Sequence, residues 1–172
     1  LDGTKEFINQ RDEFTVNIAL IEEGRPIMGV VVAPALGLTW AGSPDGAFRQ
    51  RVGGDERTAI QLRDVPDAGL TVTASRSHAD PAALEALLKG QKVAEVINAG
   101  SSLKFCRVAE GSADLYPRQG RTMEWDTAAG QAVAEAAGAA VLRLEDRSPL
   151  TYGKAGLDNP HFIVGQASVI EG

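Results

Sequence analysis

Leu1-Asp2-Gly3-Thr4-Lys5-Glu6-Phe7 opens the chain and decides how the rest is interpreted. It places a carboxylate, a glycine and a hydroxyl within one turn of chain. Carboxylate oxygens suit Mg²⁺, which takes few protein ligands and completes its shell with water and phosphate. Glycine lets the backbone approach a ligand, and the amides of Gly3 and Thr4 would face an anion if a helix begins here. Taken alone, the stretch is better explained as an ordinary helix cap, with Asp2 or Thr4 as the capping residue.

A second acidic motif follows more than a hundred residues later, as Glu124-Trp125-Asp126-Thr127-Ala128-Ala129-Gly130. The small residues over 128–137 predict a helix that ends at Gly138. Asp126 would then lie at the N-terminus of this helix, and Trp125 is expected to be a large apolar anchor. Each motif is a weak signal by itself, but together they predict one site for a metal ion and a phosphate.

The two stretches resemble motifs of the Mg²⁺-dependent, lithium-sensitive phosphatases of the inositol monophosphatase superfamily, namely the end of Asp-Pro-Leu-Asp-Gly-Thr and Trp-Asp-x-Ala-Ala/Gly. A finer resemblance is to the bacterial 3′(2′),5′-bisphosphate nucleotidases of the CysQ type. Four stretches carry it: Lys5-Glu6-Phe7, Ser75-Arg76-Ser77-His78, Gly100-Ser101-Ser102-Leu103-Lys104-Phe105 and Tyr116-Pro117-Arg118. Inositol monophosphatases, the nearest alternative, usually carry Asn-Phe in place of Glu6-Phe7.

The resemblance covers essentially the whole chain and implies an α/β (α+β) fold. This is the layered αβαβα sandwich of the inositol monophosphatase and fructose-1,6-bisphosphatase type, with its N-terminal segment missing. The family motif has an Asp-Pro pair just before the position of Leu1, and a catalytic glutamate lies farther upstream. We therefore expect the chain to be the C-terminal two-thirds of an enzyme. We also expect this exact chain, in isolation, to be an inactive fragment without a complete metal site, even if it folds.

The chain is expected to form two halves, because strands follow one another in the first part and alternate with helices from Leu70 onward. Residues 1–67 would be the remainder of a metal-binding sheet subdomain, and 68–172 a C-terminal α/β subdomain that carries the nucleotide site. The apolar run at 27–33 predicts a strand buried on both faces, and 51–67 predicts a polar linker. The other expected elements are strands at 14–21, 38–41, 46–49, 70–74, 92–97, 113–116, 140–144 and 161–165, and helices at 80–88, 101–110 and 128–137.

The resemblance assigns the hydrolytic chemistry to the first motif and to Asp126. Asp2 would be a carboxylate shared between two or more Mg²⁺ ions, with the carbonyl of Leu1 as a further ligand. Asp126 would hold the second metal and contact the substrate near the leaving oxygen. The hydroxyl of Thr4 would orient a water and help to deprotonate it, and the amides of Gly3 and Thr4 would receive the phosphate. Two such ions stabilise both the attacking and the leaving oxygen, and Li⁺ is expected to inhibit.

Substrate specificity is expected in the second half of the chain. Ser101 and Lys104 are three residues apart, so a helix would present both on one face, and Arg118 can engage phosphate through a planar fork. The resemblance implies that these three residues bind the nucleotide and its non-scissile phosphate. The alternative is that Ser101 caps a helix while Lys104 and Arg118 are solvated surface charges. His78 would either contact the adenine or cap the helix that follows it.

Composition narrows the classes of partner and compartment. A net charge of −6 argues against a nucleic-acid groove, because binding along a phosphate backbone needs a basic face. The single cysteine, Cys106, excludes an internal disulfide and fits a reducing cytoplasm. No apolar run approaches the roughly 20 residues that span a bilayer. We expect a cytoplasmic protein, with peripheral association at the inner membrane left open.

The expected reaction is removal of the 3′-phosphate from 3′-phosphoadenosine 5′-phosphate, which leaves AMP, or from the corresponding 5′-phosphosulfate. It would clear a nucleotide by-product of sulfur assimilation. Inositol-1-monophosphatase activity is the alternative, disfavoured by Lys5-Glu6-Phe7 and by the nucleotide-type segment over 101–118. If nothing covers the sheet over 14–50, its apolar face and edge would invite association, so a homo-oligomer is possible.

Overall fold

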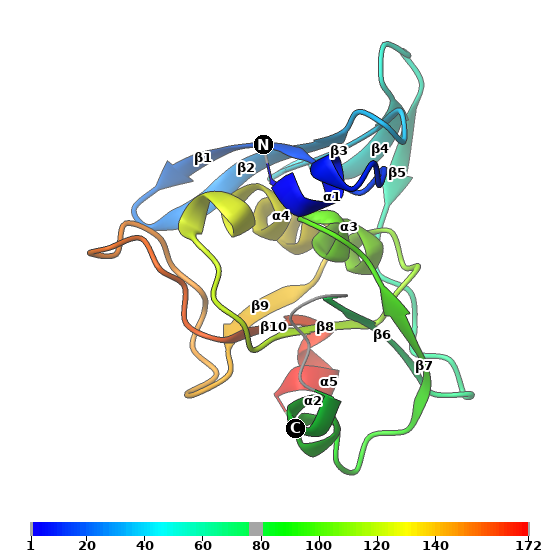
Figure 1. Cartoon of the computed structure of the whole chain (residues 1–172), viewed down its shortest axis with the longest axis vertical. Coiled ribbons are helices and arrows are strands. Elements are labelled where there is room, and N and C mark those ends of the chain that lie inside the picture. Colours follow the sequence, from blue (N-terminus) through cyan, green and yellow to red (C-terminus); the bar gives the residue numbers. More distant parts are fainter. Residues whose placement is uncertain (1, 76–80, 172) are drawn as a thin grey trace.

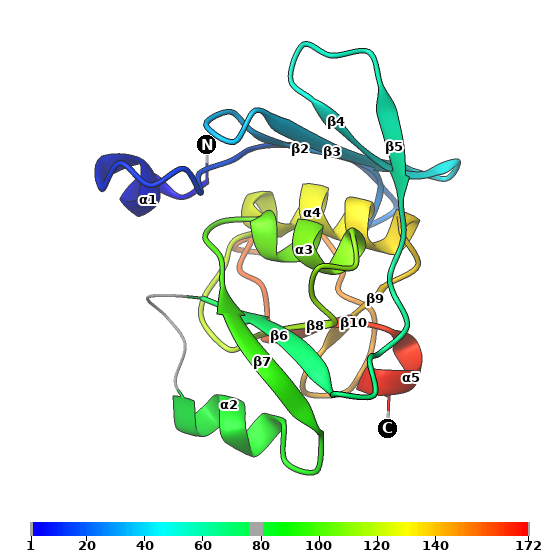
Figure 2. The same cartoon turned by 90° about the vertical axis from the view of Figure 1, so that its right-hand side faces the viewer.

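The computed structural model describes residues 2–75 and 81–171, apart from the side chains of Lys5 and Pro81, and folds them into two five-stranded sheets. Two helices, α3 and α4, lie between the sheets as a middle layer (Figures 1 and 2). The helices are α1 Thr4–Ile8, α2 Pro81–Leu87, α3 Leu103–Ala109, α4 Glu124–Ala136 and α5 Ala167–Ile170. The short helix α5 was not expected from the sequence.

The first sheet is an antiparallel meander in the order β1-β2-β3-β4-β5. Its strands are β1 Val16–Glu22, β2 Arg25–Ala33, β3 Leu38–Ser43, β4 Gly46–Arg51 and β5 Arg57–Ile60. The β1–β2 turn is tight because Glu23 and Gly24 both adopt positive φ, at 48° and 78°, which matches the twist of the flanking strands.

Burial of β2 on both faces, predicted from its apolar run, is wrong. Val31 and Ala33 are fully buried, whereas Met28 and Val30 are 47% and 37% exposed. An antiparallel sheet can pack one face on a helical layer and leave the other open, and here the packed face is the one toward α4. On the outer face of the sheet, Ile18 of β1 pairs with Val30 of β2. The homo-oligomer predicted from the sequence would form through this apolar face.

The polar linker predicted over 51–67 contains a strand. β5 pairs with β4 from Gln50↔Arg57 to Ala47↔Ile60. In β5, Ile60 is half-buried and the other three residues are exposed. This edge strand therefore lacks the alternation of apolar and polar residues by which a strand is predicted from sequence.

The second sheet is mixed, in the order β7-β6-β8-β10-β9. β6 runs parallel to β7 and β8, whereas β10 is antiparallel to β8 and β9. The strands are β6 Leu70–Ala74, β7 Val93–Asn98, β8 Leu115–Arg118, β9 Ala140–Arg143 and β10 Phe162–Gly165. Alternation of strand and helix therefore produces parallel pairs only in the first part of this sheet.

Small residues let α4 lie directly on the first sheet. A Cβ at Gly29 would come within 2.4 Å of the Ala129 carbonyl oxygen, and one at Gly42 within 2.6 Å of the Ala132 oxygen. On the other side, Gly130 lies against the ring of Phe105. The predicted end of this helix is confirmed, because Gly138 follows it with a φ of +98°.

The helical layer belongs to two cores. Val133 of α4 packs with Trp40 of the first sheet, and the next residue, Ala134, packs with Phe162 of the second. The first sheet ends at Ile60 and the second begins at Leu70, close to the predicted boundary at 67/68. That each sheet belongs to an independent subdomain stays a prediction. Within the described residues, no helix is long and apolar enough to cross a membrane.

Candidate active site

A pocket of about 380 Å³ lies where the first motif, the start of α3 and the start of α4 meet. Every predicted site residue that the structure describes lines it: Asp2, Gly3, Thr4, Ser101, Lys104, Arg118 and Asp126. The predicted residues Leu1 and His78 lie outside the described residues. The two acidic motifs, far apart in the sequence, thus line the same pocket.

The first motif is held by backbone pairing. The amide of Asp2 donates to the Thr15 carbonyl at 2.8 Å, and the Thr15 amide donates back at 2.9 Å. Gly3 follows with a φ of +89°, and a Cβ at this position would lie 2.1 Å from the Ser101 hydroxyl. Glycine is therefore required here both by its conformation and by the close approach of Ser101. Thr4 is exposed and begins α1.

The segment before α3 braces the first motif. The Ser101 hydroxyl lies 3.0 Å from the Asp2 carbonyl oxygen and 2.8 Å from that of Glu13, and the Gly100 amide donates to the Glu13 carboxylate at 3.0 Å. Ser101 has a φ of +46° and precedes α3. The prediction that Ser101 and Lys104 share a helical face is therefore wrong, because the helix begins two residues later than expected. The alternative that Ser101 caps the helix is also wrong, since the capping position belongs to Ser102.

Lys104 is a buried cation at the pocket wall, only 4% exposed. Its Nζ donates to the carbonyl oxygens of Ala99 at 3.1 Å and Ser101 at 2.6 Å, and lies 5.4 Å from the centre of the Tyr116 ring. Burial, and then repulsion from Arg118, lower the pKa of Lys104 to about 8. A solvated surface charge, the alternative for Lys104, is excluded by this burial.

Arg118 brings a second cation to the pocket from the end of β8. Its Nε donates to the Gly120 carbonyl at 3.2 Å, and Nη2 donates to that of Arg121 at 3.1 Å. A guanidinium has five N–H donors, so donors remain for an anion in the pocket.

Asp126 is the third residue of α4, and one of its oxygens closes the helix start. Oδ2 accepts from the Met123 amide at 3.0 Å, and the Asp126 carbonyl accepts from the Ser102 hydroxyl at 2.7 Å. One carboxylate oxygen of Asp126 therefore caps the start of α4, and the other oxygen takes no part in this contact. Trp125, predicted as an apolar anchor, is instead 60% exposed at the pocket rim.

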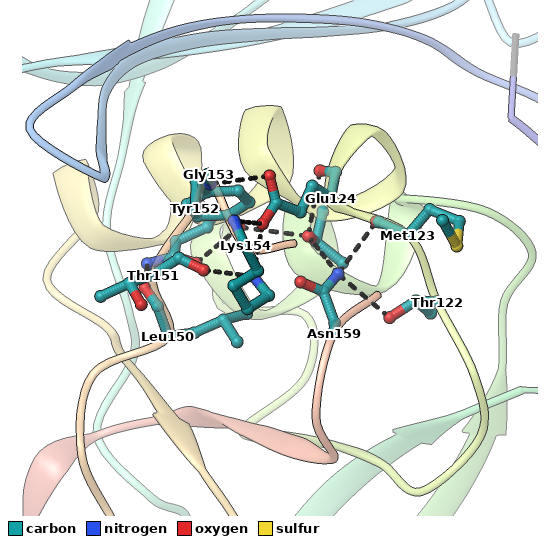
Figure 3. Close-up of polar contacts among 11 residues, drawn as sticks. Thr122, Met123, Glu124, Leu150, Thr151, Tyr152, Gly153, Lys154 and Asn159 are labelled. Atoms are coloured by element: carbon teal, nitrogen blue, oxygen red, sulfur yellow. Dashed lines mark hydrogen bonds and ion pairs between the residues drawn. The ribbon is translucent and has the colours of Figure 1, made fainter. Parts of the chain in front are cut away.

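A segment far along the chain clamps the first turn of α4 (Figure 3). The Glu124 carboxylate accepts from the amides of Gly153 and Lys154, both at 2.9 Å, and pairs with Lys154 Nζ at 2.7 Å. Asn159 Nδ2 donates to the Met123 carbonyl at 2.9 Å. Burial alone would raise the pKa of Glu124, but the hydrogen bonds from Lys154 and Gly153 outweigh it and lower that pKa. These contacts were not predicted from the sequence, because the spacing of Glu124 and Lys154 does not indicate that the two residues meet.

The pocket concentrates negative charge at Asp2. Burial, and then repulsion from the Asp126 carboxylate, raise the pKa of Asp2, while Lys104 and Ser102 partly oppose the shift. A divalent cation would relieve this repulsion, and Mg²⁺ can be held by one or two carboxylates with water and substrate phosphate. The donor set thus fits Mg²⁺. Among residues 2–75 and 81–171, no cluster of three or more His, Cys, Asp or Glu residues offers a complete protein site.

The fold and the pocket together define a class of protein. It is a layered α+β protein whose pocket combines carboxylates that suit a metal ion with a buried lysine and a half-buried arginine that suit an anion. The chain belongs to the inositol monophosphatase family, whose sequence model matches residues 1–170. The resemblance inferred from the motifs is confirmed.

Known relatives agree with this assignment. The chain is 49% identical over 165 residues to the 3′(2′),5′-bisphosphate nucleotidase CysQ of Escherichia coli (strain K12), covering 95% of this chain and 65% of that protein. The crystal structure of CysQ from Bacteroides thetaiotaomicron superposes with a TM-score of 0.87 at 42% identity, over 96% of this chain and 67% of that one. An inositol monophosphatase from Zymomonas mobilis superposes with a TM-score of 0.80 at 25% identity, over 99% and 64% of the two chains. The layered α+β fold predicted from the sequence is confirmed by these structures.

Proposed function

We propose that the protein is a metal-dependent phosphate monoester hydrolase of the bisphosphate nucleotidase type. Its substrate would be 3′-phosphoadenosine 5′-phosphate, from which it removes the 3′-phosphate to leave AMP, or the corresponding 5′-phosphosulfate. The observation that carries the proposal is the pocket in which Asp2 and Asp126 lie together with Lys104 and Arg118. Identity of 49% to a protein named as a bisphosphate nucleotidase supports the choice of substrate.

Asp2 and Asp126 would hold Mg²⁺ through their carboxylates. When bound, the metal would supply activation of a water and withdrawal of charge from the leaving oxygen. The hydroxyl of Thr4, exposed at the pocket, would orient the attacking water. The amides of Gly3 and Thr4 would bind the phosphate that is cleaved.

Lys104 and Arg118 would bind the second, non-scissile phosphate. The Lys104 ammonium has three donors, and two of them are held by the Ala99 and Ser101 carbonyls. The third donor is left for the pocket. Two cations suit a substrate with two phosphates better than inositol 1-phosphate, which has one. Such an enzyme would clear a by-product of sulfate activation in the cytoplasm.

The decisive experiment measures phosphate release from 3′-phosphoadenosine 5′-phosphate and from inositol 1-phosphate, with Mg²⁺ and with added Li⁺. A complete metal site should give hydrolysis of the nucleotide, inhibition by Li⁺, and a KM that rises about tenfold or more in Arg118→Ala, because a charge-assisted hydrogen bond is lost. Arg107→Ala is the matched control, since Arg107 pairs with Glu110 away from the pocket. A preference for inositol 1-phosphate would favour the inositol monophosphatase alternative, and turnover of neither substrate would favour the alternative of a fragment that folds without a complete metal site.

A further inference from the structure

The hydroxyl of Ser102 lies between the two acidic motifs. Its Oγ donates to the Asp126 carbonyl at 2.7 Å, and Asp2 Oδ2 is the next acceptor, at 3.4 Å. Ser102 is 1% exposed. A single buried side chain therefore contacts both segments that carry the pocket carboxylates.

Asn17 of β1 orients this hydroxyl. Its Nδ2 donates to Ser102 Oγ at 2.8 Å, which occupies one lone pair and directs the single hydroxyl proton toward the acidic motifs. The Asn17 Oδ1 atom is buried and has no hydrogen-bond partner among the described residues. A buried amide oxygen without a hydrogen bond destabilises a fold, so the presence of an asparagine at this position needs a reason other than stability.

We propose that Asn17 and Ser102 form a positioning pair that fixes the Asp2 carboxylate relative to the first turn of α4, so that Asp2 and Asp126 can hold the same cation site. The inference rests on the proposed function, because it concerns the site that the two carboxylates would form. Neither residue lines the pocket, so the pair would not contact a substrate bound there. It acts through the Asp126 carbonyl and the Asp2 carboxylate, as hydrogen-bonded partners of ligating groups do in metal sites.

The test separates a positioning role from a structural one with two variants of the protein. Ser102→Ala leaves the Asn17 amide without its acceptor, so both stability and the site are expected to suffer. Asn17→Leu combined with Ser102→Ala replaces both polar partners by apolar side chains of similar shape, which can be nearly neutral for stability. Ser112→Ala is the matched control, because Ser112 lies beyond the other end of α3 and bonds to Arg107 and Glu110.

The readouts are Mn²⁺ binding, from the electron paramagnetic resonance signal of the free ion, and thermal unfolding without metal. We expect Mn²⁺ affinity to fall about 10-fold to 100-fold in Ser102→Ala, together with the unfolding temperature. In the double variant the unfolding temperature should recover while Mn²⁺ affinity stays low, and the control should change neither.

Three results would overturn the inference. Recovery of Mn²⁺ affinity together with stability in the double variant would make the pair purely structural. Unchanged affinity in Ser102→Ala would remove its role at the site. No Mn²⁺ binding by the unsubstituted protein would overturn the proposed function, and the inference would fall with it.

Discussion

At Gly3, two separate requirements for glycine can be measured independently. Gly3 and Gly37 both have positive φ, at 89° and 64°, but only Gly3 has a neighbour where a Cβ would be. Gly37→Ala should lower the free energy of unfolding by about 1 kcal/mol, the cost of left-handed backbone for an L residue. Gly3→Ala adds a clash with Ser101 and should cost about 3 kcal/mol. Urea unfolding of the two variants gives both values.

A third variant isolates the clash. Gly3→Ala with Ser101→Ala removes the crowded hydroxyl but leaves the backbone strain, so part of the lost stability should return. Equal effects of Gly3→Ala and Gly37→Ala would contradict the close packing of the first motif on the segment before α3.

Single residues at the site were predictable where a motif carried them. Asp2, Asp126, Lys104 and Arg118 stand in recognisable stretches, and all line the pocket. Asn17, in contrast, stands in no motif, and the residue it contacts, Ser102, lies 85 residues away in sequence. Residues whose only signal is a distant contact cannot be found from local spacing.

At the scale of elements, one ion pair ties the segment after β5 to the second sheet. Arg63 donates to both oxygens of Asp114, each at 2.8 Å, and the Thr71 amide donates to Oδ2 at 2.7 Å. Burial alone would raise the pKa of Asp114, but the hydrogen bonds from Arg63 and Thr71 outweigh it, and the net pKa is lowered.

The lowered pKa fixes the sign of a pH dependence. The stabilisation of the fold by the Arg63–Asp114 pair is fully present above about pH 4, which is the pKa of an aspartate in an unfolded chain. It is lost as the pH falls through the lower pKa of Asp114 in the folded protein. Asp114→Asn should lower the free energy of unfolding at pH 7 by about 2 kcal/mol, less than a fully buried pair would lose, because Arg63 is partly exposed.

Denaturant unfolding between pH 2 and 7 checks this prediction, and the gap between the variant and the unsubstituted protein should narrow toward pH 2. Asp146→Asn, at an exposed pair with Arg143, is the control and should change little. A gap that stays constant with pH would show that the charge of Asp114 does not stabilise the fold.

Helices and strands could be predicted from the sequence where their residues show a clear local pattern of apolar, small or helix-ending residues. The alanine-rich helix α4 was found with its C-terminal glycine, because small residues and Gly138 are both local signals. The strand β5 was missed, since its exposed edge position leaves no alternation. Burial of β2 was misjudged, because a run of apolar residues does not say whether one or both faces of a sheet are covered.

For the whole molecule, the shared helical layer bears on whether the two predicted subdomains are independent. Val133 of α4 belongs to the core against the first sheet, and Val164 of β10 to the core against the second; both are fully buried. α3 and α4 contribute side chains to both cores. Neither sheet keeps its packing if these helices unfold, so we expect one cooperative unit despite the two sheets.

This expectation predicts a single calorimetric transition that either core can shift. Val133→Ala and Val164→Ala should each cost about 2 kcal/mol and lower the midpoint of that one transition by roughly 4–8 °C for a chain of this size. The midpoints from tryptophan fluorescence, where buried Trp40 reports the first core, and from far-ultraviolet circular dichroism should coincide in both variants. If instead Val133→Ala moved one transition and Val164→Ala another, the halves would be separate folding units, and the pocket between them would depend on docking of two preformed domains.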